Sequence, residues 1–326
     1  MTAFTNFSAQ EDALLNPGDS LCPGCSIPVI LKLVLRAAHH PLVVSNASGC
    51  FRTPPAHSPR SPWHANWIHT QTGSAAVMSG ITAMYRSLKK KGKTSIEREL
   101  KFLVIGGDGA TSDEGLGAIS GMFERGDDIV YLCYDNQLAA HIGGQATSAT
   151  PMGASTGTTP AGTVFPGKLQ SRKNITAIFA AHRIPYVAQS APWLWHDLYR
   201  KAQRAFEISG PAYLNVLSPC PANWKTPPAK TVALSKLAAD TCVWPIFEIQ
   251  YGTRVTVNYH PKPQRPVTEW LKTQDRFLHL LEKENKWIVD KIQEEINKDW
   301  ELLLSMAGSN SPSQPDEENY TESYER

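Results

Sequence analysis

Strand-like and helix-like segments alternate over residues 27–219, and this alternation constrains the fold of the chain more than any other feature. The runs KFLVIGG (101–107) and DIVYLCYDN (128–136) are rich in apolar residues, which is typical of strands covered on both faces. GSAAVMSGITAMYRSLKKK (73–91), which precedes them, has helical spacing. Short strands that alternate with helices predict right-handed crossovers. We therefore expect an α/β fold, a doubly wound parallel sheet with helices on both faces.

Composition divides the chain into four parts. We expect an N-terminal segment (1–20), a main α/β domain (21–225) and, after a proline-rich turn, a helical extension (226–307). The last part, 308–326, lacks an apolar pattern and is expected to be disordered. The extension carries apolar residues at helical spacing, which indicates packing against the main domain or a contact with another subunit.

A long segment rich in Gly, Ser, Thr and Pro, 143–170, follows closely on the strand that ends in YDNQ. A loop of this length inside a compact domain is usually functional or disordered. Its attachment to the end of a strand favours a binding loop.

Charge and hydropathy exclude several classes of protein. The 326 residues carry a formal net charge of +2, and the short run KKKGK (89–93) is a solvated helix end rather than a nucleic-acid patch. No apolar stretch approaches the roughly 18–20 residues that span a bilayer, and no signal peptide is recognisable. We expect a cytoplasmic protein without a nucleic-acid partner. In that compartment its six cysteines are metal ligands or buried thiols rather than disulfides.

The motif IGGDGATSDEG follows a buried strand and opens a helix. Its glycines allow backbone N–H groups to approach a phosphate, and the start of a helix favours an anion. Asp108, a carboxylate inside this turn, would repel that anion unless a divalent cation such as Mg²⁺ lies between them. Asn136, at the end of the next strand and 28 residues further on, is the expected second ligand. The alternative is a glycine-rich turn with a capping Asp.

Four cysteines form a candidate metal set: Cys22 and Cys25 in CPGC, Cys50 in NASGC, and Cys220 in LSPC. The last two lie at the ends of predicted strands, on the side where the Gly-Asp-Gly loop is expected. Four thiolates suit structural zinc or an iron–sulfur cluster. Cys133 and Cys242 lie in apolar runs and are expected in the core.

Seven motifs in unbroken order resemble the β subunit of the 2-oxoacid:ferredoxin oxidoreductases, the family of pyruvate:ferredoxin oxidoreductase. They are CPGC, NASGC, GGDG, YDNQ, TPMGASTGTTPAGTVFPGK, AAHRIPYVA and VLSPCPANW. The resemblance implies that 21–225 binds thiamine diphosphate, Mg²⁺ and one [4Fe–4S] cluster.

The resemblance also assigns residues. It implies Mg²⁺ ligation by the side chains of Asp108 and Asn136 and the carbonyl of Leu138, and cluster ligation by Cys22, Cys25, Cys50 and Cys220. The implied cofactor-binding residues are Gly49, Cys50, Gly107, Asp108, Gly109, Ala110, Asn136, Leu138 and His141.

The implied activity is oxidative decarboxylation of a 2-oxo acid, with one-electron transfer to the cluster and formation of acyl-coenzyme A. An α subunit is expected to complete the active site, and γ and ferredoxin-like δ subunits or domains to pass electrons to ferredoxin or another acceptor. His141 stands where pyruvate-type relatives carry a substrate-facing Asn, as a proton donor or a neutral substitute. The substrate is therefore open between pyruvate, an aryl glyoxylate, oxalate and a branched 2-oxo acid. A zinc-stabilised structural subunit and a non-oxidative decarboxylase subunit are the rival hypotheses.

Overall fold

The structure is a computed structural model that describes residues 14–15, 19, 21–51, 66–94, 96 and 98–308. Most of the expected N-terminal segment, and the expected tail from residue 309 onward, lie outside the described residues.

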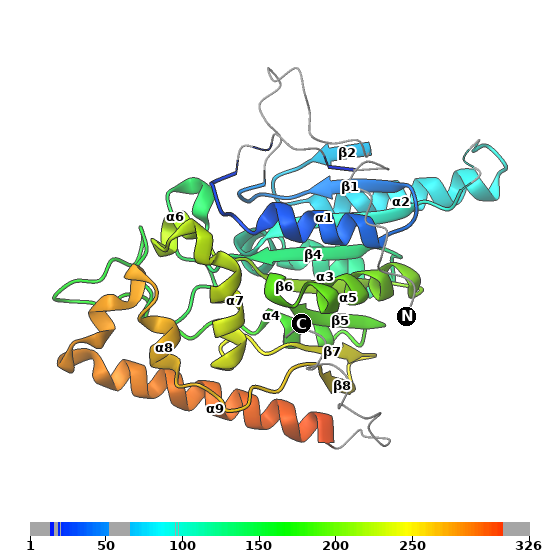
Figure 1. The fold of residues 1–326 in the computed structure, drawn as a ribbon. Coiled ribbons are helices and arrows are strands. Elements are labelled where there is room, and N and C mark those ends of the chain that lie inside the picture. The colour runs from blue at the N-terminus through cyan, green and yellow to red at the C-terminus, as the bar shows by residue number, and fades with distance from the viewer. Residues whose placement is uncertain are drawn as a thin grey trace.

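Eight strands form one sheet in the order β2-β1-β3-β4-β6-β5-β7-β8 (Figure 1). The first six strands in this order pair in parallel, whereas β7 pairs antiparallel with both β5 and β8. The strands are β1 (Leu42–Asn46), β2 (Asn66–His69), β3 (Lys101–Gly107), β4 (Val130–Asp135), β5 (Tyr186–Ser190), β6 (Ala212–Leu217), β7 (Phe247–Gln250) and β8 (Arg254–Val257). The predicted doubly wound sheet is confirmed. The short edge strands β2 and β8 were not predicted, because four residues carry little alternation.

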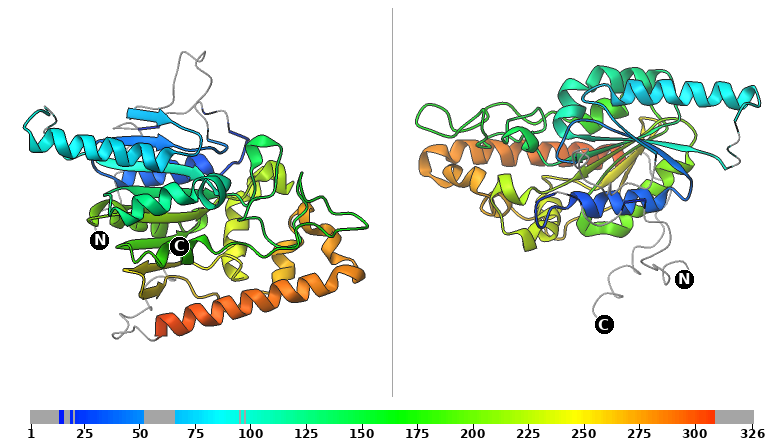
Figure 2. Two further views of the ribbon diagram at one scale, coloured as in Figure 1. Left: turned by 180° about the vertical axis from the view of Figure 1, so that it is seen from behind. Right: turned by 90° about the horizontal axis from the view of Figure 1, so that it is seen from above.

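Helices cover both faces of the sheet (Figure 2). One face packs against α1 (Ile27–Ala37) and α5 (Trp195–Glu207). The other packs against α2 (Ser74–Lys90), α3 (Leu116–Glu124), α4 (Ile175–Ala180) and the far end of the C-terminal helix. A π-helical turn, Ala110–Glu114, leads from β3 into α3.

The spacing of apolar residues explains why these helices pack as they do. In α1, Ile27, Ile30, Leu31 and Val34 are 0–1% exposed and lie on one face. Burying each such side chain contributes about 1.5–3 kcal/mol. Pro28 is tolerated because it lies in the first turn, where its missing N–H has no helical partner.

The C-terminal region forms a third core beside the sheet. Its helices are α6 (Pro221–Trp224), α7 (Thr231–Asp240), α8 (Val267–Leu271) and α9 (Lys286–Gly308), with 3₁₀ turns at Asp275–Leu281 and Lys283–Asn285. Trp224, Trp244 and Trp270 fill this core. Among the apolar residues of the helical extension, Phe277 is buried, whereas Leu278 is 45% exposed. No helix in the described part of the chain combines the length and apolar character needed to cross a membrane.

Candidate functional site

Four neighbouring strands bring the predicted ligands to one edge of the sheet. Cys50 follows β1, Asp108 follows β3, Asn136 follows β4 and Cys220 follows β6, and these strands are adjacent in the order β1-β3-β4-β6. Because they are parallel, their carboxyl ends meet at the same edge. The chain also reverses its winding direction at β1, whose two neighbours are β2 and β3. Such a switch point is where open α/β sheets bind ligands.

A narrow cavity, called here the cofactor cavity, lies at this edge. All nine residues predicted to bind the cofactor line it, together with Ser48, Tyr134, Ala139 and Ala140. Its volume is about 10 Å³, room for about one water molecule.

Gly49 allows the loop after β1 to approach β4 closely. A Cβ atom at this position would lie 1.8 Å from the Tyr134 hydroxyl oxygen, and the residue has a positive φ of 153°. That hydroxyl accepts a hydrogen bond from the backbone N–H of Phe51 at 3.1 Å. A side chain at position 49 would displace Tyr134 and move Cys50, the next residue.

Asp108 is a buried carboxylate that lacks a cationic partner among the described side chains. It is 2% exposed, and the Thr147 hydroxyl donates to its Oδ2 at 2.5 Å. Burial, with a further contribution from Asp135, raises the pKa of Asp108 well above its usual range. Asp135 differs because Arg172 Nη2 donates to it at 2.9 Å. A divalent cation at Asp108 would supply the missing positive charge.

The amide of Asn136 completes a set of oxygens around this point. One end of the amide lies 2.9 Å from Asp108 Oδ1 and 2.6 Å from the Leu138 carbonyl oxygen. If that end is the nitrogen, it donates to both. If it is the oxygen, three oxygens converge, and Nδ2 donates to Cys50 Sγ at 3.5 Å. Adjacent ligands of octahedral Mg²⁺ lie about 2.9 Å apart, so the second orientation fits a magnesium ion.

The four predicted cysteine ligands are free thiols. The backbone N–H of Cys25 donates to the Cys22 carbonyl at 3.0 Å, which forms the turn of CPGC. Burial, with smaller contributions from Cys220 and Cys22, raises the pKa of Cys25 to about 12. Burial likewise raises the pKa of Cys50 to about 12, with further contributions from Cys220 and Cys25. Cys25 and Cys50 therefore lie near Cys220 and near each other, and Cys22 lies near Cys25.

The thiols are not arranged around a single ion. No three His, Cys, Asp or Glu side chains in the described ranges are placed to hold one metal ion. Thiolates on one zinc would lie about 3.8 Å apart, whereas each thiolate of an iron–sulfur cluster binds its own iron. N–H groups also point at these sulfurs, since both the backbone and the side-chain nitrogen of Asn223 lie 3.5 Å from Cys220 Sγ. Such donors are typical of cluster thiolates. Cys133 and Cys242 are buried in the core, as predicted.

His141 lies on a 3₁₀ turn, Ala140–Ile142, and lines the cofactor cavity. It is half-buried, on the side of the cavity formed by the residues after β4. The structure thus brings the one predicted catalytic residue to the same cavity as Asp108 and Cys50.

Three further residues at this edge were not predicted from the sequence. Gln137, between two proposed Mg²⁺ ligands, has a positive φ of 64° and accepts a hydrogen bond from Arg276 at 2.6 Å. Trp224 Nε1 donates to the Asn136 carbonyl oxygen at 3.0 Å. The guanidinium of Arg276 lies 4.1 Å from the centre of the Trp224 ring. No local pattern marks Arg276, which is 140 positions from Asn136 in the sequence.

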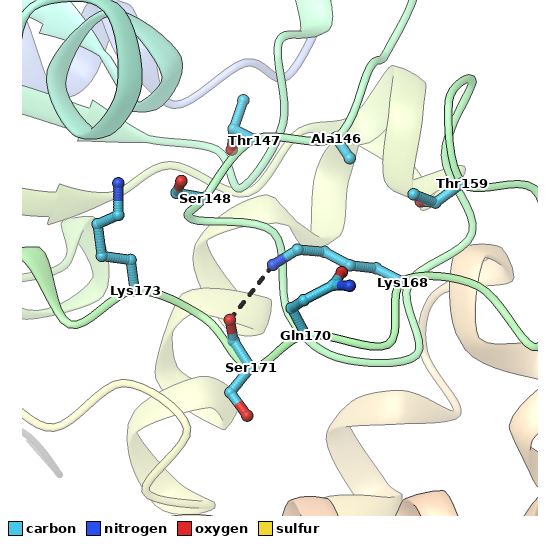
Figure 3. A pocket seen from close by; sticks show the side chains of 8 residues that line it. All are labelled: Ala146, Thr147, Ser148, Thr159, Lys168, Gln170, Ser171 and Lys173. Atoms are coloured by element: carbon cyan, nitrogen blue, oxygen red, sulfur yellow. Dashed lines mark hydrogen bonds between the residues drawn. The ribbon is translucent and has the colours of Figure 1, made fainter.

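A second and larger recess, about 420 Å³ in volume, lies beside the cavity and is formed by the loop that includes 143–170 (Figure 3). Lys168 is 7% exposed and donates to the carbonyls of Thr150 at 2.6 Å and Ser171 at 3.4 Å. Lys173 donates to the Ser112 carbonyl. Both ammonium groups therefore hold the loop in place. Thr147 lines this recess and bonds Asp108, which connects the loop to the cofactor cavity.

Comparison with known proteins identifies the class. Residues 47–216, which contain Cys50, Asp108 and Asn136, match the family described as thiamine pyrophosphate enzyme, C-terminal TPP binding domain. A pyruvate synthase subunit PorB from Thermotoga maritima is 39% identical over 90% of this chain and 91% of its own length. The PorB of Methanocaldococcus jannaschii is 38% identical over 88% and 95%. A ketoisovalerate oxidoreductase subunit VorB from Pyrococcus horikoshii is 34% identical over 89% and 92%.

The chain therefore belongs to the thiamine-diphosphate-binding β subunits of the 2-oxoacid:ferredoxin oxidoreductases. Among solved structures, a 2-oxoglutarate:ferredoxin oxidoreductase from Magnetococcus marinus, with 2-oxoglutarate, coenzyme A and succinyl-CoA bound, shares the fold. Its TM-score is 0.52 at 21% identity, over 67% of this chain and 77% of that one. The resemblance seen in the motifs is confirmed.

Proposed function

We propose that this subunit binds thiamine diphosphate through Mg²⁺, holds one [4Fe–4S] cluster, and serves in the oxidative decarboxylation of a 2-oxo acid. The observation that carries the proposal is the gathering of Cys50, Asp108, Asn136 and Cys220 at the carboxyl ends of four adjacent parallel strands. Thiamine diphosphate, when bound, supplies the nucleophile and the electron sink for loss of CO₂.

The residues after β3 and β4 would hold the diphosphate end of the cofactor. Asp108, Asn136 and the Leu138 carbonyl are the proposed Mg²⁺ ligands, and Gly107, Gly109 and Ala110 border the same cavity. Thr147 fixes one oxygen of Asp108 and leaves the other facing Asn136. Asn136 thus joins the Mg²⁺ position to Cys50 through its two amide ends.

Cys22, Cys25, Cys50 and Cys220 are the proposed cluster ligands. Cys50 also lines the cofactor cavity, so an electron leaving the cofactor would have a short path to the cluster. The burial that raises the pKa of Cys50 in the free protein would be offset on metal binding, because iron stabilises the thiolate.

We further propose that His141 faces the substrate and either donates a proton or hydrogen-bonds the substrate carboxylate. The rest of the cofactor site is assigned to a partner α subunit, because the relatives of this chain are named as subunits of larger enzymes. Coenzyme A as acyl acceptor, and γ and ferredoxin-like δ partners, complete the proposal.

An anaerobic analysis of iron, sulfide, magnesium and thiamine would test this assignment. The chain is purified with its natural partner subunits as wild type and as Cys50→Ser, with Cys242→Ala as a matched control. We expect about four iron and four sulfide per copy to be lost in Cys50→Ser and kept in Cys242→Ala. Zinc in place of iron, or unchanged iron in Cys50→Ser, would contradict the cluster assignment.

The same preparations identify the substrate. We expect acceptor reduction with one of pyruvate, 2-oxoisovalerate, oxalate or an aryl glyoxylate, and none when the chain is assayed without its partners. Activity of the isolated chain would contradict the shared active site.

A further inference from the structure

Arg276 is a buried cation whose hydrogen-bond partners are neutral. It comes from the 3₁₀ turn Asp275–Leu281 and is 4% exposed. Nη2 donates to the side-chain oxygens of Gln137 at 2.6 Å and Gln274 at 2.8 Å, and Nε donates to Gln274 at 3.0 Å. Nη1 is buried and has no hydrogen-bond partner in the described structure.

No carboxylate of the described residues lies within ion-pair distance of Arg276. A buried charge is costly unless it is paired, and a guanidinium stays protonated in proteins. Burial lowers the pKa of Arg276 to about 9, so the side chain is still charged at neutral pH. The protein therefore keeps a positive charge in its interior beside the proposed site.

The surroundings of Arg276 indicate where its counter-charge lies. Its guanidinium stacks on Trp224 at 4.1 Å, and the backbone N–H of Trp224 donates to the Cys220 carbonyl at 2.9 Å. Cys220 is the N-cap residue of α6, the short helix that ends at Trp224, so the Arg276 guanidinium lies within about one helical turn of this proposed cluster ligand. Asp135 already pairs with Arg172, and Asp108 is a proposed Mg²⁺ ligand. The proposed cluster ligand Cys220 is therefore the remaining candidate for the counter-charge of Arg276.

We propose that Arg276 is the internal counter-cation of the metal–thiolate centre at Cys220 and stabilises its reduced form. This inference rests on the proposed iron–sulfur function. A cluster held by four thiolates carries net negative charge, and reduction adds one electron without a proton. A cation fixed nearby at low dielectric therefore stabilises the reduced state more than the oxidised state.

Arg276 is thus a positioning and tuning residue that touches neither substrate nor metal. Its contact with Gln137 also holds the turn between Asn136 and Leu138. The C-terminal extension, through this one side chain, would set how readily the main domain accepts an electron.

The experiment compares Arg276→Met and Arg276→Gln with Arg276→Lys in the complex purified anaerobically with its natural partners. The midpoint potential is measured by dithionite titration followed by electron paramagnetic resonance. The signal of this cluster is identified as the one that disappears in Cys220→Ser. We expect a more negative potential in the two neutral variants and a potential near that of the wild type in Arg276→Lys.

Each outcome decides the proposal. Neutral variants that assemble no cluster, beside an Arg276→Lys variant that does, also support it, because charge is then what the centre requires. An intact cluster with an unchanged potential in Arg276→Met would overturn it, as would loss of the cluster in all three variants. Absence of iron from the wild-type complex would instead overturn the proposed function on which the inference rests.

Discussion

Arg172 and Arg276 each stack on a tryptophan ring, and they differ in how the arginine charge is balanced. Arg172 lies 4.2 Å from the centre of the Trp244 ring, and Arg276 lies 4.1 Å from that of Trp224. Arg172 also forms an ion pair with Asp135 at 2.9 Å. Arg276 has only amide partners among the described residues.

The hydrogen bonds of the two indoles show the same division. Trp244 Nε1 donates to the carbonyl of Ser190, the last residue of β5, which carries none of the predicted ligands. Trp224 Nε1 donates to the carbonyl of Asn136, a proposed Mg²⁺ ligand. In the first stack, Asp135 balances the arginine charge within the chain. In the second, the arginine has no carboxylate partner among the described residues. A buried charge without a counter-charge in the chain is a candidate position for binding a group of opposite charge.

The largest effect on stability is expected where the ion pair between Arg172 and Asp135 is broken. Arg172→Met would leave the fully buried Asp135 carboxylate without its cation, so the free energy of unfolding falls by about 3–5 kcal/mol. Chemical denaturation of the thiamine-free protein measures this loss. Arg276→Met is the matched variant at the arginine without a carboxylate partner, and it is expected to lose less stability in the same assay. Equal losses would contradict the difference between the two stacks.

An intermediate effect is expected at Asp108. Asp108→Asn removes a proposed Mg²⁺ ligand, and we expect the affinity for thiamine diphosphate with Mg²⁺ to fall by about 100-fold or more. Because the substitution also removes a buried charge beside Asp135, the cofactor-free variant melts at a higher temperature than the wild type. Calorimetric titration and thermal melting check the two parts. Unchanged affinity would show that Asp108 is only a structural capping residue.

The smallest effect is expected from removing one indole N–H. Trp224→Phe and Trp244→Phe each leave one buried carbonyl without its donor, so each costs about 1–3 kcal/mol of stability. Only Trp224→Phe is expected to weaken thiamine retention as well, by several-fold, because only its carbonyl belongs to Asn136. Equal thiamine retention in the two variants would contradict a role for Trp224 in cofactor binding.

Local sequence patterns predict the frame of the site well. The bounds of β3 coincide with the run KFLVIGG, since a central parallel strand is apolar throughout. Asp108 and Asn136 could be chosen because one helix and one strand separate them, which fixes their places at neighbouring strand ends. The family resemblance added the Leu138 carbonyl and other predicted residues that line the cofactor cavity, such as Gly49 and His141.

Contacts between segments that are distant in the chain could not be predicted from the sequence. Arg276 reaches Gln137, and Thr147 reaches Asp108, only through the packing of the C-terminal extension and the long loop. The antiparallel pairing of β7 and β8 was also missed, because a short strand at a sheet edge has no pattern that tells its direction. The sequence showed which chemistry the chain can hold, and the fold shows which side chains support it.

Anomalous X-ray scattering at the iron edge, from crystals of the complex grown without oxygen, tests the central claim most directly. We predict a signal enclosed by Cys22, Cys25, Cys50 and Cys220, beside the cofactor cavity, that rises across the iron edge and does not rise across the zinc edge. A zinc signal at that place, or iron only in other subunits, would contradict the assignment of an electron-accepting cluster to this chain.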